Sequence, residues 1–107
     1  MLRHMVKSKI ERVMLTETNL NYQGSIGIDP DFLEQADILV GEKVQVLNLN
    51  NGERLETYVI LEPRGSKNII LYGPAARKGM KGDLVTIISY MLIDDAKARD
   101  YIIKVVS

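Results

Sequence analysis

The sequence contains no cysteine and no tryptophan, and its only histidine is His4. Without cysteine the chain can form no disulfide bond and perform no thiol chemistry, which fits a reducing compartment. One histidine and no cysteine cannot assemble a zinc site from nitrogen and sulfur ligands, and a serine–histidine–aspartate triad would have to be built on His4. The phosphate-binding loops GxxxxGKS/T and GxGxxG are also absent. If the protein is an enzyme, its reactive group must therefore be unusual.

An excess of charge of either sign is also absent, because 14 lysines and arginines balance 14 aspartates and glutamates. This balance argues against a nucleic-acid partner. The longest apolar stretches, such as residues 85–92, are interrupted by Thr86 and Ser89 and are too short to span a bilayer. Residues 1–9 alternate charged and apolar side chains and lack a signal-peptide core. We therefore expect a soluble, cytoplasmic protein without nucleic-acid or membrane partners.

The length of the chain and the absence of a linker favour one domain over residues 1–107. No repeat, low-complexity segment or linker divides the chain. A domain of this size buries only part of its unfolded surface, so contacts within an oligomer would help to stabilise it.

Short runs of apolar and β-branched residues are typical of strands. The clearest run is 44–60, where Asn51-Gly52 predicts a tight hairpin, because both central positions of such a turn require positive φ. The other predicted strands are 68–72, 84–92 and 102–106, and residues 73–83 are rich in turn formers.

Two segments suggest helices. Asp29 is a good N-cap for a helix that begins at Pro30, and a turn or short helix is expected over 94–100. In residues 6–14 the apolar positions follow a helical period, whereas the family resemblance described below requires a strand, and both interpretations stay open. Together the patterns predict a mainly β domain with one or two short helices, most naturally a small closed barrel.

The chain contains two Gly-Ser pairs, Gly24-Ser25 and Gly65-Ser66. The second lies among turn residues and predicts a surface turn. The first is bracketed by residues typical of strands, where glycine is an intrinsically poor choice, so we expect a bulge or a strained backbone at Gly24. The pair alone is a weak signal, and its interpretation depends on the residues around it.

Several short motifs share one resemblance. In chain order they are Lys9, then Tyr22-x-Gly24-Ser25-x-x-Ile28-Asp29, Asn51-Gly52-x-Arg54-x-x-Thr57-Tyr58, Arg64-Gly65-Ser66, Gly73-x-Ala75-Ala76 and Gly82-Asp83. Each motif is weak alone. Their order and spacing agree with the bacterial aspartate 1-decarboxylases from about residue 2 to residue 100. The sequence therefore resembles that family.

The resemblance implies a closed six-stranded double-psi β-barrel, a homotetramer, and a lyase that converts L-aspartate to β-alanine and carbon dioxide for pantothenate and coenzyme A biosynthesis. It also implies a precursor that cuts itself into a β chain (1–24) and an α chain (25–107). The Oγ atom of Ser25 attacks the carbonyl of Gly24, where glycine allows a twisted backbone. This attack would give an ester through an acyl shift, and β-elimination would then break the ester and release the carboxylate of Gly24. Hydrolysis of the resulting enamine, with loss of ammonia, would leave a covalent pyruvoyl group at position 25 that forms a Schiff base with substrate. This group takes the role of pyridoxal phosphate, so neither that cofactor nor a metal is expected.

The remaining site residues are carried over position by position. The resemblance implies that Thr57 assists cleavage by stabilising the oxyanion, and that Tyr58 donates a proton from a phenol that is neutral at pH 7. Arg54 and Lys9 match cations that hold substrate carboxylate, and Gly73, Pro74 and Ala75 match the substrate-binding turn. Strand alternation puts Thr57 on the face opposite Arg54 and Tyr58. A bulge, a strand end or a neighbouring subunit must therefore bring Thr57 to the site.

Three positions depart from the family pattern. Glu11 replaces a usual histidine, Tyr72 replaces a usual asparagine, and Pro74 replaces a commoner alanine and removes a backbone donor. These changes bear on the rate and the exact substrate more than on the reaction type. The basic residues at 77, 78 and 81 are interpreted as a solvated loop.

Two alternatives to the aspartate decarboxylase stay open. The first, from another class, is an unprocessed, non-catalytic β-barrel that acts as an interaction or oligomerisation module. The second is a related pyruvoyl decarboxylase for another amino acid, which Tyr72 favours. The sequence also leaves open whether maturation needs a helper protein.

Overall fold

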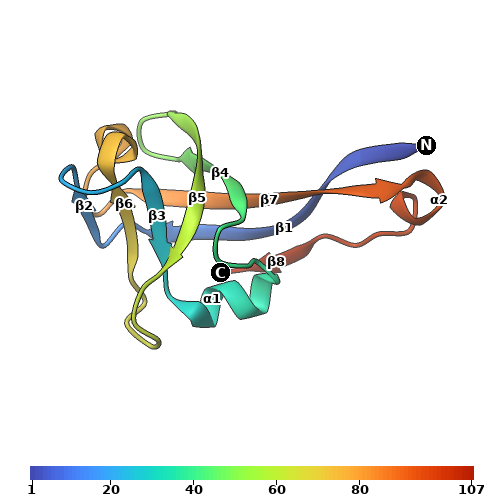
Figure 1. Ribbon diagram of the computed structural model, residues 1–107, viewed down its shortest axis with the longest axis horizontal. Helices are drawn as coiled ribbons and strands as arrows, with labels where there is room; N and C mark the ends of the chain where they lie inside the picture. Colours follow the sequence, from blue (N-terminus) through green and yellow to red (C-terminus); the bar gives the residue numbers. More distant parts are fainter.

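Strands make up about half of the chain, as its runs of apolar and β-branched residues predict. The computed structural model describes residues 1–107 (Figure 1). The strands are β1 (Leu2–Met14), β2 (Glu17–Asn19), β3 (Ser25–Ile28), β4 (Lys43–Asn48), β5 (Arg54–Leu61), β6 (Ile69–Tyr72), β7 (Leu84–Asp94) and β8 (Lys104–Val106). The helical segments are α1 (Pro30–Ala36), the 3-10 helix η1 (Gly73–Lys78) and α2 (Asp95–Ala98). The predicted mainly β class with short helices is confirmed.

The strands form one sheet in the order β2-β6-β3-β5-β4-β7-β1-β8. β1 and β2 lie near opposite ends of this order, although only Leu15 and Thr16 separate them in the chain. The sheet must therefore curl until its ends approach, and the N–H of Thr16 donates to the carbonyl of Ile69 in β6 at 2.9 Å. Six strands have four or more residues, while β2 and β8 have three. This arrangement is consistent with a small β-barrel.

The N-terminal segment is a strand, so its interpretation as an amphipathic helix is wrong. β1 pairs with β7, and the register shifts between Val6 and Ser8 and again between Ile10 and Val13. Such a shift marks a bulge, where one strand carries an extra residue. The second bulge contains Arg12 at φ +54°, and Ile10 and Val13 on either side of it are both buried. A three-residue spacing that looks helical therefore comes from a bulged strand.

The predicted hairpin joins β4 to β5, but its turn is longer than two residues. Only Gly52 of the Asn51-Gly52 pair has positive φ, at +75°. The N–H of Asn48 donates to the carbonyl of Glu53 at 2.8 Å. The side-chain oxygen of Asn48 accepts hydrogen bonds from the N–H groups of Asn50 (2.8 Å) and Asn51 (3.2 Å). Asparagine side chains thus take over contacts that the backbone makes in a tighter turn.

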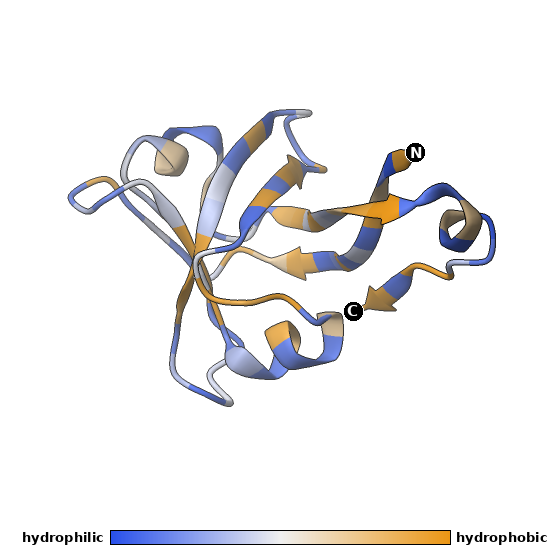
Figure 2. Cartoon of the chain, turned by 45° about the vertical axis from the view of Figure 1, so that its right-hand side comes forward, coloured by the Kyte–Doolittle hydropathy of each residue, from blue (hydrophilic) through white to orange (hydrophobic).

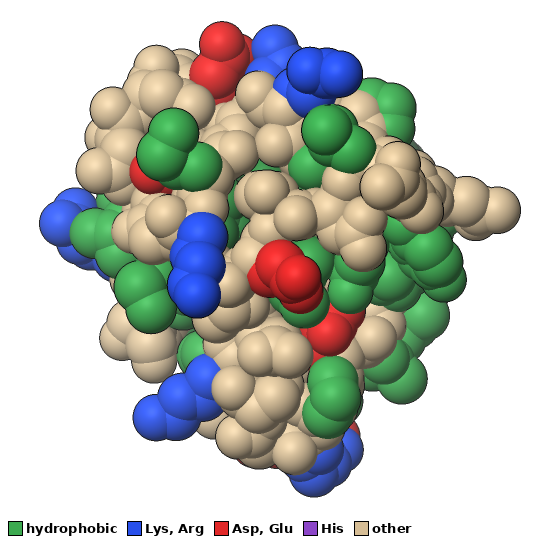
Figure 3. Space-filling model, turned by 90° about the vertical axis from the view of Figure 1, so that its left-hand side faces the viewer, with side chains coloured by type: hydrophobic (Ala, Val, Ile, Leu, Met, Phe, Trp, Pro, Cys, Tyr) green, Lys and Arg blue, Asp and Glu red, His purple; other side chains and the backbone are tan.

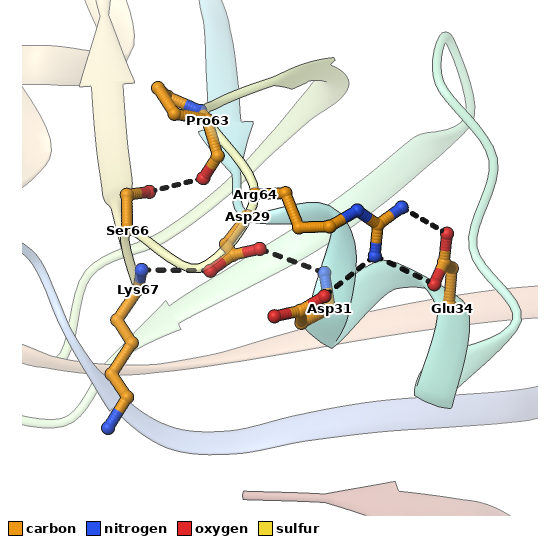
Figure 4. A network of polar contacts seen from close by, with 7 residues as sticks. All are labelled: Asp29, Asp31, Glu34, Pro63, Arg64, Ser66 and Lys67. Carbon is orange, nitrogen blue, oxygen red and sulfur yellow. Dashed lines mark hydrogen bonds and ion pairs between the residues drawn. The ribbon is translucent and has the colours of Figure 1, made fainter.

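The C-terminal end of β3 runs into α1 through the N-cap that the sequence predicts. One oxygen of the buried Asp29 carboxylate accepts from the N–H of Asp31 at 2.9 Å, and the other accepts from the N–H of Lys67 at 2.8 Å. Burial opposes ionisation of Asp29, but these backbone hydrogen bonds and the charge of Arg64 lower its pKa. Arg64 also bonds Asp31 at 2.7 Å and Glu34 at 2.6 Å (Figure 4). The network ties β3, α1 and the loop after β5 together.

The core is one cluster of 18 buried residues drawn from every strand except β2, from α1, from η1 and from two connecting segments. Apolar segments meet where the strands cross near the middle of the molecule, and polar segments occupy the turns (Figure 2). None of the helices is long and apolar enough to cross a membrane. Ile26 belongs to this cluster and Ser25 beside it is buried, so the N-terminal end of β3 lies against the core.

Candidate active site

Ser25 is the first residue of β3 and is fully buried. Its hydroxyl donates a hydrogen bond to the carbonyl of Gln23 at 3.0 Å, so the side chain is turned back along its own backbone. The preceding residues 20–24 are exposed. The reactive serine of the predicted cleavage therefore lies where an exposed loop enters the sheet.

The close backbone contact at this point comes from Gly73 rather than from Gly24. Gly24 does not have positive φ, so the strain expected at Gly24 is not found. Gly73 has φ +63°, and a Cβ on it would lie 2.6 Å from the carbonyl oxygen of Tyr22 and 2.7 Å from the nitrogen of Gly24. Only glycine fits this conformation and this contact. η1 thus begins pressed against the residues that precede Ser25.

A cavity of about 390 Å³ adjoins Gly24. Its lining comes from Gly24, from residues 55–58 of β5, and from Pro74, Ala75 and Lys78 of η1. These three segments are far apart in the sequence. The structure therefore brings together five of the predicted site residues, namely Gly24, Thr57, Tyr58, Pro74 and Ala75.

Thr57 reaches the cavity at the end of a strand pairing. β5 pairs with β4 in unbroken register from Arg54 to Tyr58, so no bulge turns the Thr57 side chain. The parallel pairing of β3 with β5 begins only at Ile26 and Val59. Thr57 and Tyr58 therefore lie beyond the paired part of β3, beside the chain that leads into it. Neither a bulge nor an end of β5 lies at Thr57, which is the fourth of its eight residues; it is the start of β3 that leaves Thr57 open to the cavity.

Arg54 and Lys9 do not line this cavity. A guanidinium nitrogen of Arg54 donates to the side-chain oxygen of Gln45 at 3.1 Å. The strand registers place Lys9, Ile88, Gln45 and Glu56 in one row across the sheet. Lys9 is thus three strand spacings, or about 14 Å, from Glu56. Both cations share one face of the sheet, but one chain does not bring them to Gly24.

Tyr72 lies opposite Ser25 in the pairing of β3 with β6. Its hydroxyl donates to a carboxylate oxygen of Glu62 at 2.7 Å, and its ring centre lies 5.0 Å from that of Tyr22. Burial, and then the hydrogen bond to Glu62 and its charge, raise the pKa of Tyr72. Glu62 fits here because a Cβ on Gly27 would overlap its carboxylate. Tyr72 does not line the cavity, so it packs beside Ser25 without facing the space for a substrate.

The surroundings of Tyr72 are acidic. Figure 3 views the end of the molecule that carries β2, β6 and η1, and acidic side chains lie among apolar ones near the middle of this face. Glu17 in β2 adds its charge to that of Glu62 in raising the pKa of Tyr72. A negatively charged ligand that approaches Tyr72 therefore meets the like charges of Glu17 and Glu62, while lysine and arginine side chains lie elsewhere on the same face.

Two charged residues of the cavity were missed by the sequence analysis. Glu56 pairs with Lys43 at 2.7 Å, and Lys78 pairs with Glu53 at 3.0 Å. Strand alternation could have indicated Glu56, because it lies on β5 between two predicted site residues. No local pattern distinguishes Lys78 from the basic residues near it, because only the path of η1 brings it to the cavity.

The structure is thus a small, mainly β domain with a cavity beside Gly24. The family model described as aspartate decarboxylase matches residues 1–107. Aspartate 1-decarboxylase of Thermoanaerobacter pseudethanolicus is 55% identical over 106 residues, which cover 99% of this chain and 91% of that protein. The enzyme of the same name from Pelotomaculum thermopropionicum is 61% identical over 97 residues, covering 91% of this chain and 74% of that protein. The chain therefore belongs to the aspartate decarboxylase family.

Proposed function

We propose that this chain cuts itself between Gly24 and Ser25 and then decarboxylates L-aspartate to β-alanine, a step that would supply pantothenate and coenzyme A biosynthesis. The membership of the family carries the reaction class, that of a carboxy-lyase. The observation that supports the cleavage is the buried hydroxyl of Ser25, turned back toward the carbonyl of Gln23 at 3.0 Å. The products would be residues 1–24 and a modified chain 25–107.

The cavity fits a pyruvoyl group at position 25. Gly24 lines the cavity and Ser25 lies buried next to it, so a new end at residue 25 would be shielded by the core and would face the same space. A pyruvoyl group supplies a ketone that condenses with the substrate amine and a carbonyl that accepts the electrons left when carbon dioxide departs. Because it forms from the chain itself, this chemistry requires no pyridoxal phosphate and no metal.

The residues around the cavity have distinct proposed roles. Thr57 would donate a hydrogen bond to the oxyanion formed during cleavage. Tyr58 would protonate the substrate carbon after decarboxylation, because an ordinary phenol is protonated at neutral pH. Gly73 holds the segment before Ser25 by its close contact, and the turn at Pro74 and Ala75 would bound the substrate.

Arg54 and Lys9 would bind substrate carboxylate only if another copy of the chain brings them to the cavity. One chain leaves both outside it. We propose that the homotetramer implied by the resemblance serves this purpose. Co-expression of the Ser25→Ala and Lys9→Ala variants tests the idea. In a mixed oligomer, a site that combines Ser25 of one copy with Lys9 of the other should restore part of the activity. No restoration, with mixed oligomers verified, would contradict it.

Denaturing mass spectrometry of the purified protein tests the proposed maturation. We expect two fragments that meet at Gly24, the larger without a free amino terminus, and release of carbon dioxide from L-aspartate. Ser25→Ala should give one uncut and inactive chain. Ser66→Ala changes the other Gly-Ser pair and is the matched control, which should still be cut.

Other outcomes would replace the proposal. A wild-type chain that stays intact after prolonged warming, alone and with cell extract as a source of a maturation factor, would favour a non-catalytic module. Cleavage without release of carbon dioxide from aspartate would favour a related decarboxylase for another amino acid.

A further inference from the structure

We propose that Lys78 is the cation, supplied by the same chain as Ser25, that holds the side-chain carboxylate of the substrate in the cavity. This inference rests on the proposed function. Of the side chains that line the cavity, Glu56 and Lys78 are charged, and Lys78 is the one cation. Glu56 is paired with Lys43, and the proposed Arg54 and Lys9 come from another copy, so Lys78 is the cation that the chain carrying Ser25 offers to a substrate with two carboxylates.

The backbone at Lys78 is held firmly in place. Its carbonyl accepts hydrogen bonds from the side-chain amides of Asn48 at 3.2 Å and Asn51 at 3.0 Å. The next residue, Gly79, packs so closely that a Cβ there would lie 2.8 Å from Leu15. These contacts involve backbone atoms and not the Lys78 side chain. Because Lys78 lines the cavity, its side chain reaches the cavity from a fixed backbone position.

The ammonium group of Lys78 has a partner that a substrate can replace. Its Nζ lies 3.0 Å from a carboxylate oxygen of Glu53, and both side chains are about half exposed, at 45% and 46%. Ion pairs with this exposure contribute little to stability, because water competes for both partners. A substrate carboxylate in the cavity can thus take the place of the Glu53 carboxylate without a change in the backbone.

This exchange would contribute to the preference for an acidic amino acid. The α-carboxylate of aspartate leaves as carbon dioxide, so the remaining carboxylate is the group that can anchor the substrate throughout the reaction. A neutral amino acid offers no carboxylate side chain to compete with Glu53 for Lys78. Lysine suits such a contact because its ammonium is a compact charge on a flexible stem.

Steady-state kinetics with L-aspartate tests the role of Lys78. We expect Lys78→Met to raise KM by about tenfold or more, because a charge-assisted contact is lost, with much less change in kcat. Lys78→Arg, which keeps the charge, should restore most of the affinity. Lys81→Met removes an exposed lysine outside the cavity and is the matched control, with KM unchanged. Mass spectrometry of each variant checks that cleavage is complete.

Glu53→Gln separates substrate binding from a structural ion pair. If the pair only stabilises the fold, both partners are equivalent, and Glu53→Gln and Lys78→Met change KM alike. If Lys78 binds substrate, Glu53→Gln frees the ammonium, and its KM stays at or below that of the wild type. An unchanged KM in Lys78→Met, or an equal rise in both variants, overturns the inference. Should Lys78→Met fail to mature, Glu53→Gln decides alone. A wild-type enzyme that releases no carbon dioxide refutes the proposed function instead, before any variant is compared.

Discussion

The two ends of strand β3 are held in very different ways. At the C-terminal end, Asp29 is 1% exposed, its carboxylate accepts backbone hydrogen bonds, and Arg64 adds ion pairs around it (Figure 4). At the N-terminal end, residues 20–24 are exposed and Gly73 packs against them, but the side-chain hydrogen bonds there are local, from the N–H of Asn21 to the side chain of Asn19 and from the Ser25 hydroxyl to the carbonyl of Gln23. One end of the same four-residue strand is thus fixed and the other is lightly held.

The two ends of β3 therefore have different roles, one in positioning Ser25 and the other in its reaction. The fixed end sets the register of the strand against β5 and β6, so the position of Ser25 is defined. The lightly held end keeps the freedom that an attack of Ser25 on the preceding carbonyl requires, since reactive segments tend to lie where the structure opens at low cost. Changes near Ser25 that touch the reaction should therefore affect cleavage or turnover, whereas changes to the hydrogen bonds that hold the fold should affect stability.

The largest effect is expected beside the lightly held end, from Tyr58→Phe in β5. This change removes the proposed proton donor but keeps the ring that lines the cavity. Turnover of L-aspartate should fall by about 100-fold to 10,000-fold, the usual contribution of a positioned acid or base. Cleavage should still occur, which mass spectrometry checks. Tyr101→Phe, far along the chain, should turn over normally, and a Tyr58→Phe enzyme of full activity would exclude the assigned role.

A smaller effect is expected from Gly73→Ala. A Cβ would meet the carbonyl of Tyr22 and the nitrogen of Gly24, in a backbone region that disfavours alanine by about 1–2 kcal/mol. Cleavage should slow by about tenfold or more, as followed by the loss of intact chain with time. Gly82→Ala is the matched control, because Gly82 also has positive φ, at +96°, but open space around it. Equal rates in the two variants would show that the contact with Gly24 is irrelevant.

At the fixed end, Asp29→Asn should lower the melting temperature by about 4–8 °C at neutral pH. Folding lowers the pKa of Asp29, so its stabilisation is present above the unfolded value of 3.8 and is lost as pH falls through the folded value. The gap between wild type and variant should therefore shrink in acid. Calorimetry from pH 7 down to pH 3 measures it, with Asp100→Asn as an exposed control. A constant gap would contradict the assignment.

The smallest effect is expected from Tyr72→Phe, which removes the hydrogen bond to Glu62. Folding raises the pKa of Tyr72, so the stabilisation is complete below the unfolded value of about 10 and is lost as pH rises above it. Absorbance titration of the five tyrosines should show one that ionises late in the wild type and is missing from the variant. If the late step persists in Tyr72→Phe, another tyrosine is responsible.

Local signals in the sequence predicted the elements whose causes are local. The N-cap at Asp29 and the hairpin at Asn51-Gly52 depend on a few neighbouring residues, and both are present. The bulges of β1 depend on its pairing with β7, so the spacing of Ile10 and Val13 suggested a helix that the structure does not contain. The length of the hairpin turn depended on side-chain contacts of Asn48, which φ preferences do not reveal.

The site was predictable only in part. Gly24, Thr57 and Tyr58 were assigned from motifs, and the strand end that brings them to one cavity follows from the pairing of β3 with β5. The close contact lies at Gly73 because η1 turns back on the segment before Ser25, a tertiary feature without a sequence signature. Lys78 was missed for the same reason, whereas strand alternation could have indicated Glu56.

The path of β1 has a consequence for the matured protein. A cut after Gly24 would place β1 and β2 on a separate peptide, yet β1 would remain between β7 and β8, paired with both. The two fragments would then form a heterodimer held by strand pairing, and unfolding would become dissociation. Stability would rise with protein concentration by mass action, and a denatured mature enzyme would have to find its lost strand again by diffusion.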